Sequence, residues 1–262
     1  MPAIAFLPPE QPMPALRHRP LKAWRHFREL VKDKENTREV FHIFEALPWK
    51  GMPRAAQAFL SSERGRAVLA REPSLPELLD DHAGLRRLPA GSVAHAYCDF
   101  MEAEGLTARG LVEEFESYAL ERPDNLIPFA PYLDRIRDTH DLLHVLTGYG
   151  RDALGEQCVL AFSYSQQPSP GFLFIAYAGG LELKRAAKGS RAPVFRAIRE
   201  GQRLGKACPR VAELSIRDLL AMPLEEARAK LGIAPPRHYA QAHRVWRGMG
   251  IDPYDLLNSQ SA

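Results

Sequence analysis

The chain has 262 residues, of which 45% are hydrophobic and 26% charged, and this composition excludes a wholly disordered, collagen-like or low-complexity protein. Its 35 basic and 32 acidic side chains leave a net charge of +3, which is too small to indicate a nucleic-acid-binding protein. A transmembrane helix needs about 20 mainly apolar residues, and no segment of the sequence has such a run. The three widely spaced cysteines form no Cys-x-x-Cys metal pair and are typical of a reducing compartment.

The N-terminal segment differs in composition from the rest of the chain. Residues 1–20 contain six prolines and predict a flexible, disordered leader, while residues 251–262 predict a short tail. Between them, residues 21–250 are expected to form one domain, because no linker divides them. The N-terminus lacks a basic start followed by an apolar core, so no secretory signal is predicted. The expected location is the cytoplasm of a bacterium.

From residue 21 onward the hydrophobic pattern is that of helices. The segment 36–39 resembles a capping box, in which Asn36 accepts a hydrogen bond from the first turn and Glu39 reaches back. Further along, Ser92 is expected to begin a helix that Gly105 ends, and Thr107 to begin the next one.

The second half of the chain continues this helical pattern. Residues 131–147 are expected to form one helix, and further helices are predicted around 157–166 and 172–184. Alternating polar and apolar residues bounded by turns, the sign of half-buried strands, are absent from the pattern. The predicted fold is therefore all-α, a single helical domain with a disordered Pro-rich leader.

The most informative segment carries two histidines four residues apart. On a helix, His140 and His144 project from one face about one turn apart, which is the spacing by which His-Glu-x-x-His helices hold a divalent metal. Asp141 is three residues before His144 and reaches the same side. It is a candidate ligand, or a hydrogen-bond acceptor for a ligand imidazole.

A fourth candidate, Glu156, follows twelve residues after His144. On one straight helix that separation is about 18 Å, too far for a shared ion. Gly148 and Gly150 supply a break, and Asp152 is placed to cap a second helix that folds back. The spacing therefore predicts two ligand-bearing helices joined by a Gly-Tyr-Gly turn.

A structural interpretation of these residues is also open. Histidine pairs at this spacing occur by chance, Asp141 can bond its neighbours, and Glu156 can be a solvated residue near a helix start. The rest of the first helix is apolar, however, and burying two imidazoles and a carboxylate beside such a face is costly unless they are paired or coordinate a metal. This favours the metal site.

The pattern His140-Asp141-x-x-His144, followed after eleven residues by Glu156, resembles the motif of the coenzyme Q biosynthesis protein four family. The resemblance covers most of residues 35–235. Segment 88–97 resembles the family's Leu-Pro-x-Gly-Ser element, and segments 197–203 and 223–228 resemble its basic and late helices. The loop 148–152 departs from the family, whose members often carry a Leu-Pro turn there.

The resemblance implies an all-helical peripheral membrane protein of ubiquinone biosynthesis. It implies that His140, Asp141, His144 and Glu156 bind a divalent metal, zinc first, with iron, cobalt and manganese as alternatives. It also implies oxidative removal of the ring carboxylate of a polyprenylated 4-hydroxybenzoate, leaving a hydroxyl. The resemblance further implies a homodimer that contacts other coenzyme Q biosynthesis enzymes. The implied location is the inner membrane of a bacterium. In a eukaryote it is the matrix side of the mitochondrial inner membrane.

A concentration of basic residues between 184 and 210 fits such a substrate. On a helix, Arg196, Arg199 and Arg203 share one face, which suits an anionic membrane surface or an acidic substrate head. They are the candidate substrate-binding residues, although a solvated face is the commoner explanation of a charge run. The uncharged run 157–181 is a candidate wall for a polyprenyl tail, with ordinary core helices as the alternative.

Two functions of different kinds follow from these observations. The first is a metal-dependent decarboxylase, a lyase, in which the metal acts as a Lewis acid. The alternative is a non-catalytic lipid-binding scaffold that organises the other pathway enzymes around a structural metal. An open coordination position favours the enzyme, and a closed four-ligand site favours the scaffold. A metallohydrolase is less favoured, because Asp141 replaces the glutamate that serves those peptidases as general base.

Overall fold

The structure is a computed structural model that describes residues 16–32, 36–118 and 124–257. Residues 1–15 of the predicted leader and 258–262 of the predicted tail lie outside the described residues. Within the described ranges the chain forms helices and no β-strand, apart from one isolated bridge between Ser92 and Pro223. The all-α prediction is confirmed. None of the helices in these ranges combines the length and apolarity needed to cross a bilayer.

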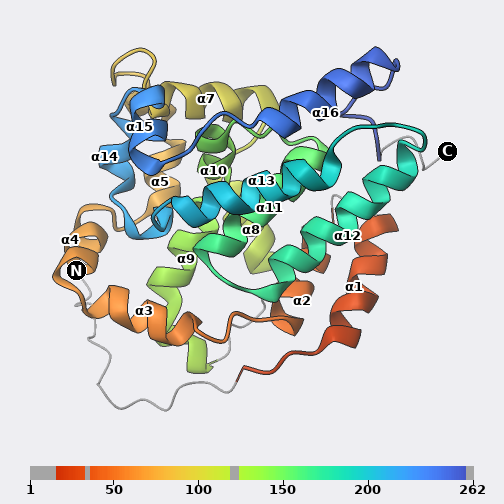
Figure 1. Cartoon of the computed structure of the whole chain (residues 1–262). Helices are drawn as coiled ribbons and strands as arrows, with labels where there is room; N and C mark the ends of the chain where they lie inside the picture. The colour runs from red at the N-terminus through yellow and green to blue at the C-terminus, as the bar shows by residue number, and fades with distance from the viewer. Residues whose placement is uncertain (1–15, 33–35, 119–123, 258–262) are drawn as a thin grey trace.

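The first half of the chain forms short helices, coloured red to yellow-green in Figure 1. They are α1 (Pro20–Lys32), α2 (Thr37–Ala46), α3 (Met52–Ser61), α4 (Glu63–Arg71), α5 (Leu75–Asp80), α6 (His82–Leu85), α7 (Val93–Glu104), α8 (Ala108–Tyr118) and the 3-10 helix η1 (Asp124–Phe129). Ser92 caps α7 by accepting from the amide of His95, and Gly105 ends it in a left-handed conformation. The hydroxyl of Thr107 accepts from the amide of Gly110 in α8. These predicted boundaries are confirmed.

The second half contains the longest helices and the centre of the core. They are α9 (Ala130–Asp138), α10 (His140–Thr147), α11 (Ala153–Gln166), α12 (Pro170–Ala186), α13 (Val194–Ala207), the 3-10 helix η2 (Val211–Glu213), α14 (Ile216–Leu220), α15 (Leu224–Leu231) and α16 (Arg237–Gly248). Helix α11 is buried along most of its length and packs against α12 and α13. The uncharged run 157–181 is therefore mainly ordinary core.

The prediction of one helix over residues 131–147 is wrong. Helix α9 ends at Asp138 and α10 begins at His140, with Thr139 between them at φ −88° and ψ 0°. The Thr139 hydroxyl donates to the carbonyl of Arg135 at 2.9 Å. A threonine that bonds back to the preceding turn bends a helix, and the bend gives the two histidines a helix of their own.

The capping box predicted at residues 36–39 is also wrong. The Asn36 side chain makes no capping hydrogen bond. The Glu39 carboxylate instead contacts Nδ1 of His26 on α1 at 2.6 Å. A partner on a neighbouring helix thus replaces the local cap, and this contact helps to hold α1 against α2.

A buried ion pair anchors α9 to the end of α4. Arg135 donates to Glu72 at 3.0 Å, and both side chains are almost fully buried. Glu72 also accepts from the backbone amides of Ile216 and Arg217 at the start of α14. Burying these charges is tolerable because the carboxylate is fully engaged in hydrogen bonds. The pair positions α9, which leads directly into the helix of the candidate site.

Candidate metal centre

The two halves of the sequence motif lie on α10 and α11. Gly148 ends α10 in a left-handed conformation at φ +74°, which glycine adopts without strain. Asp152 then caps α11 by accepting from the amides of Leu154 and Gly155. At Gly155 a Cβ atom would lie 1.9 Å from the carbonyl oxygen of Gly150, so only glycine allows this tight return. The predicted break and cap are confirmed.

The return brings Glu156 to both histidines. Its Oε2 lies 3.5 Å from Nε2 of His144 and 3.9 Å from Nε2 of His140. One donor atom from each of the three residues lies within 4.8 Å of the others, and mixed nitrogen and oxygen ligands suit a divalent metal. The structure therefore assembles three of the four predicted ligands.

The hydrogen bonding of His144 tests whether these residues fit a metal. Nδ1 of His144 donates to the carbonyl oxygen of Tyr149 at 3.1 Å. A carbonyl can only accept, so Nδ1 carries a proton, and a metal would bind Nε2 once the ring has no proton there. That Nε2 is fully buried and has no hydrogen-bond partner among the described residues. An unpartnered ligand atom facing a carboxylate fits a cation.

Asp141 lies beside this group but is not among the three residues whose donor atoms converge within the described chain. Its negative charge acts on both histidines and favours their protonated forms. In this geometry Asp141 adds charge next to the three candidate ligands rather than a fourth candidate ligand atom.

The charges of the group determine its protonation. Burial opposes ionisation of Glu156, but the neighbouring His144 outweighs it and lowers the pKa of the carboxyl to about 2. Burial, reinforced by the charge of His144, lowers the pKa of His140. For His144 itself, burial is outweighed by the Glu156 carboxylate, which raises the pKa of the ring. Around neutral pH Glu156 is therefore anionic and His140 neutral, the forms that bind a cation.

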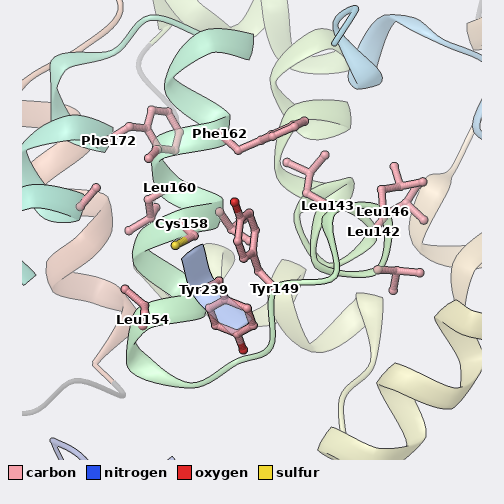
Figure 2. Packing of buried hydrophobic residues seen from close by; sticks show 14 of the residues in the cluster. Leu142, Leu143, Leu146, Tyr149, Leu154, Cys158, Leu160, Phe162, Phe172 and Tyr239 are labelled. Carbon is pink, nitrogen blue, oxygen red and sulfur yellow. The ribbon is translucent and has the colours of Figure 1, made fainter. Parts of the chain in front are cut away.

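Polar side chains of α16 fix the turn between the two helices. The Asp152 carboxylate is buried and accepts from the Tyr239 hydroxyl and, at 3.1 Å, from Nε2 of His243. The Tyr239 hydroxyl in turn accepts from the amide of Gly150 at 3.0 Å. Figure 2 shows Tyr239 against Tyr149, whose ring it meets edge-on at 5.3 Å. Helix α16 thus holds the loop that orients His144.

Other residues around the group were not identified from the sequence. Phe100 on α7 stacks on the His144 ring with centroids 5.5 Å apart. Arg151, within the turn, places its Nε 3.8 Å from Oε1 of Glu156. Arg151 can be suspected from the sequence, because it is a cation five residues before Glu156. Phe100, Tyr239 and His243 are far from the motif in sequence, and no sequence pattern connects them with it.

The predicted substrate-binding residues lie on α13. Arg196, Arg199 and Arg203 are exposed on one face of that helix, and the opposite face is buried against α11. The predicted amphipathic pattern is present. Within the described part of the chain, no hydrogen bond or ion pair connects these arginines to His140, His144 or Glu156.

Comparison with protein families decides the relationship. The model of the family described as "Coenzyme Q (ubiquinone) biosynthesis protein Coq4" matches residues 27–237, which is most of the chain and includes all four motif residues. The chain belongs to the Coq4 family. The family resemblance seen in the sequence is thereby confirmed, and the family is described as one of ubiquinone biosynthesis.

Individual relatives are named as members of the same family. The mitochondrial ubiquinone biosynthesis protein coq4 of Talaromyces stipitatus is 26% identical over 197 residues, 74% of this chain and 64% of that protein. The Neurospora crassa protein is 26% identical over 70% of this chain and 50% of its own length. The COQ4 homologue of Rattus norvegicus is 27% identical over 68% and 63%. This chain thus spans about half to two thirds of these mitochondrial relatives.

A solved structure shows the same fold. The crystal structure of a Nostoc punctiforme protein matches 83% of this chain and 99% of that chain with a TM-score of 0.58 and 22% identity. At this identity the match supports the helical architecture of Coq4 and carries no further information on its chemistry.

Proposed function

We propose that this Coq4 protein is a metal-dependent decarboxylase that replaces the ring carboxylate of a polyprenylated 4-hydroxybenzoate with a hydroxyl. The observation that carries the proposal is the three-ligand group itself. His144 is fully buried, whereas the side chains of His140 and Glu156 are about one third exposed. Three protein ligands with one accessible side correspond to a catalytic metal site that keeps an open position.

The residues present fit a divalent ion, zinc or alternatively iron, cobalt or manganese, held by His140, His144 and Glu156. Lewis-acid stabilisation of the substrate's carboxylate or phenolate is the chemistry that such an ion supplies when bound. Arg151 is the cationic side chain next to Glu156 and is suited to pair with an incoming carboxylate. Loss of carbon dioxide with gain of a ring oxygen also needs an oxidant, such as dioxygen, as co-reactant.

A membrane surface is the proposed source of the polyprenylated substrate. Trp24 on α1, half exposed, meets Phe174 on α12 at 6.3 Å, and Tyr177 stacks on the partly exposed Phe195 of α13 at 6.2 Å. Phe174 and Tyr177 are three residues apart, so they share one face of α12. Aromatic side chains beside the arginines of α13 suit the interface of an anionic bilayer.

These features support peripheral binding to the inner membrane of a bacterium, or to the matrix side of the inner membrane in mitochondria. Homodimerisation and contacts with other coenzyme Q biosynthesis enzymes belong to the same proposal. Their basis is family membership.

The test compares two variants in a ubiquinone-producing strain that lacks its own family member. His144→Ala should lose the bound metal, as measured by elemental analysis of the purified protein. Asp141→Asn should retain the lipid but lower turnover, because Asp141 adds charge next to the ligands. With either variant, mass spectrometry of lipid extracts should show accumulation of the still-carboxylated prenylated ring.

The control is Asp134→Asn, which makes the same chemical change on α9 outside the ligand group. It should leave ubiquinone at the parental level, with protein abundance checked in parallel. Normal ubiquinone in cells whose His144→Ala protein is demonstrably metal-free would rule out metal-centred catalysis. That result would favour the non-catalytic scaffold.

A further inference from the structure

A second group of potential metal ligands lies on α6 and α7. It consists of His82, Cys98 and Glu102, and one donor atom of each lies within 4.8 Å of the others. Cys98 and Glu102 are four residues apart on α7, so their side chains project from the same face. His82 is the first residue of α6, and its Nδ1 lies 3.0 Å from Oε1 of Glu102. This group has no part in the proposed decarboxylation.

The three side chains run from the core to the surface. Cys98 is fully buried and is a free thiol, the His82 side chain is one quarter exposed, and the Glu102 side chain is about half exposed. Burial raises the pKa of the Cys98 thiol, while the charge of Arg86 acts in the opposite direction. The thiol is therefore protonated in the free protein and lies at the buried end of the group.

We infer that His82, Cys98 and Glu102 form a second metal site, which takes a thiophilic divalent cation such as zinc. Zinc accepts cysteine, histidine and carboxylate ligands in tetrahedral geometry, with bonds of about 2.0–2.3 Å. Two such ligands, one nitrogen and one oxygen, lie about 3.3 Å apart around one ion. The observed 3.0 Å between His82 and Glu102 thus needs only a small widening.

The surrounding charges are compatible with a cation. A Cys98 thiolate and the Glu102 carboxylate together balance a charge of +2, and the thiol proton is released to solvent on binding. Arg86 is the nearby positive group. Its Nη1 is paired with Asp99 at 2.6 Å, and its Nη2 holds Oε2 of Glu102 at 2.8 Å. Glu102 can therefore bind the ion through Oε1 while Arg86 fixes its other oxygen, a common arrangement behind ligand carboxylates.

The sulfur ligand makes the site experimentally distinct from the His140 group, which offers nitrogen and oxygen donors. Purified full-length protein, stripped with a chelator, is titrated with Co²⁺. A cobalt ion bound to Cys98 produces a sulfur-to-metal charge-transfer absorption in the near ultraviolet, which the His140 group cannot produce. We expect two equivalents bound, one of them with this absorption.

Single substitutions should separate the two sites. Cys98→Ser, checked for folding by circular dichroism, should lose the absorption and one equivalent, and His82→Ala should do the same while leaving the thiol in place. The matched control Cys208→Ser, another buried thiol, should keep both. His144→Ala should keep the absorption and lose the other equivalent, so failure of the proposed decarboxylase site is recognised separately. A parent protein without the absorption, or Cys98→Ser with it, would overturn the inference.

Discussion

At the scale of single residues, the candidate centre depends on how His144 is oriented. Its ring is fixed by the backbone carbonyl of Tyr149, which lies in the turn between α10 and α11. That turn is tied to α16 because the Tyr239 hydroxyl accepts from Gly150 and donates to Asp152. Tyr239 lies just beyond residues 27–237, the part matched by the family model. The support of this candidate ligand thus comes partly from a residue beyond the matched range.

Substitution of Tyr239 by phenylalanine tests this support. Tyr239→Phe leaves the buried Asp152 carboxylate and the Gly150 amide each without one partner, so we expect a loss of about 1–3 kcal/mol in the free energy of unfolding. Because the turn orients His144, metal affinity should also fall by about 10–100-fold. Chemical denaturation and competition with a chelator measure the two effects.

The matched control is Tyr149→Phe in the same turn. The Tyr149 hydroxyl is buried without a hydrogen-bond partner among the described residues, so its removal should change neither quantity. Equal metal affinity in Tyr239→Phe and in the parent would contradict a role in positioning His144.

At the scale of helices, the contact between α11 and α13 organises the core. Gly201 and Gly205, four residues apart on α13, lie against the backbone of α11. A Cβ atom added at Gly201 would lie 2.5 Å from the carbonyl oxygen of Cys158, and one at Gly205 would lie 2.2 Å from that of Phe162. These glycines let the two backbones approach closely. Helix α11 carries Glu156, so this packing also places a candidate metal ligand.

Adding a methyl group at this contact should separate the helices. Gly201→Ala is expected to lower the free energy of unfolding by about 1–3 kcal/mol, the usual cost of overpacking a core. At Gly248, at the end of α16, an added Cβ meets nothing within 4 Å. Gly248→Ala should therefore be neutral or stabilise by up to about 1 kcal/mol. Urea denaturation measures the free energy of unfolding of both variants. Equal stability of the two would argue against a tight α11–α13 contact.

At the scale of the whole molecule, charge is distributed unevenly over a surface whose net charge is only +3. The exposed arginines of α13 lie beside the aromatic side chains of α12. Helices α3 and α4 lie on the opposite side of the molecule from α12 and α1 (Figure 1). Exposed arginines of α13, and exposed arginines of α3 and α4, can therefore be substituted separately.

Reversal of charge on α13 tests membrane binding. The parent should sediment with anionic vesicles less strongly as salt rises, because charge attraction is screened within about 10 Å at 0.1 M salt. A variant with Arg196, Arg199 and Arg203 changed to glutamate should lose this salt-sensitive part. The control changes three exposed arginines of α3 and α4 in the same way, namely Arg54, Arg64 and Arg66.

Each triple variant changes the net charge by −6, from +3 to −3. If binding followed net charge alone, the two variants would lose equal affinity. Such equality would contradict a specific membrane-binding face on α13, whereas retention of binding by the control would support it.

Features governed by neighbouring residues could be predicted from the sequence. Helical periodicity gave the all-α fold, and spacing alone placed His140 and His144 on one face. Gly148 and Asp152 marked the end of one helix and the start of the next, since left-handed glycines and side-chain caps act within a few residues. The four-residue spacing, the break and the cap together predicted that Glu156 returns to the histidines.

Only the tertiary structure decided which residues from distant segments meet. It gave Glu39 a partner on α1 in place of a local cap, bent the chain at Thr139, and brought Tyr239 and His243 to Asp152. It likewise brought His82 to Cys98 and Glu102. These contacts depend on how helices pack, because packing sets which side chains lose water together and must satisfy one another. Local sequence rules describe a helix and its ends, but not the surface against which it is buried.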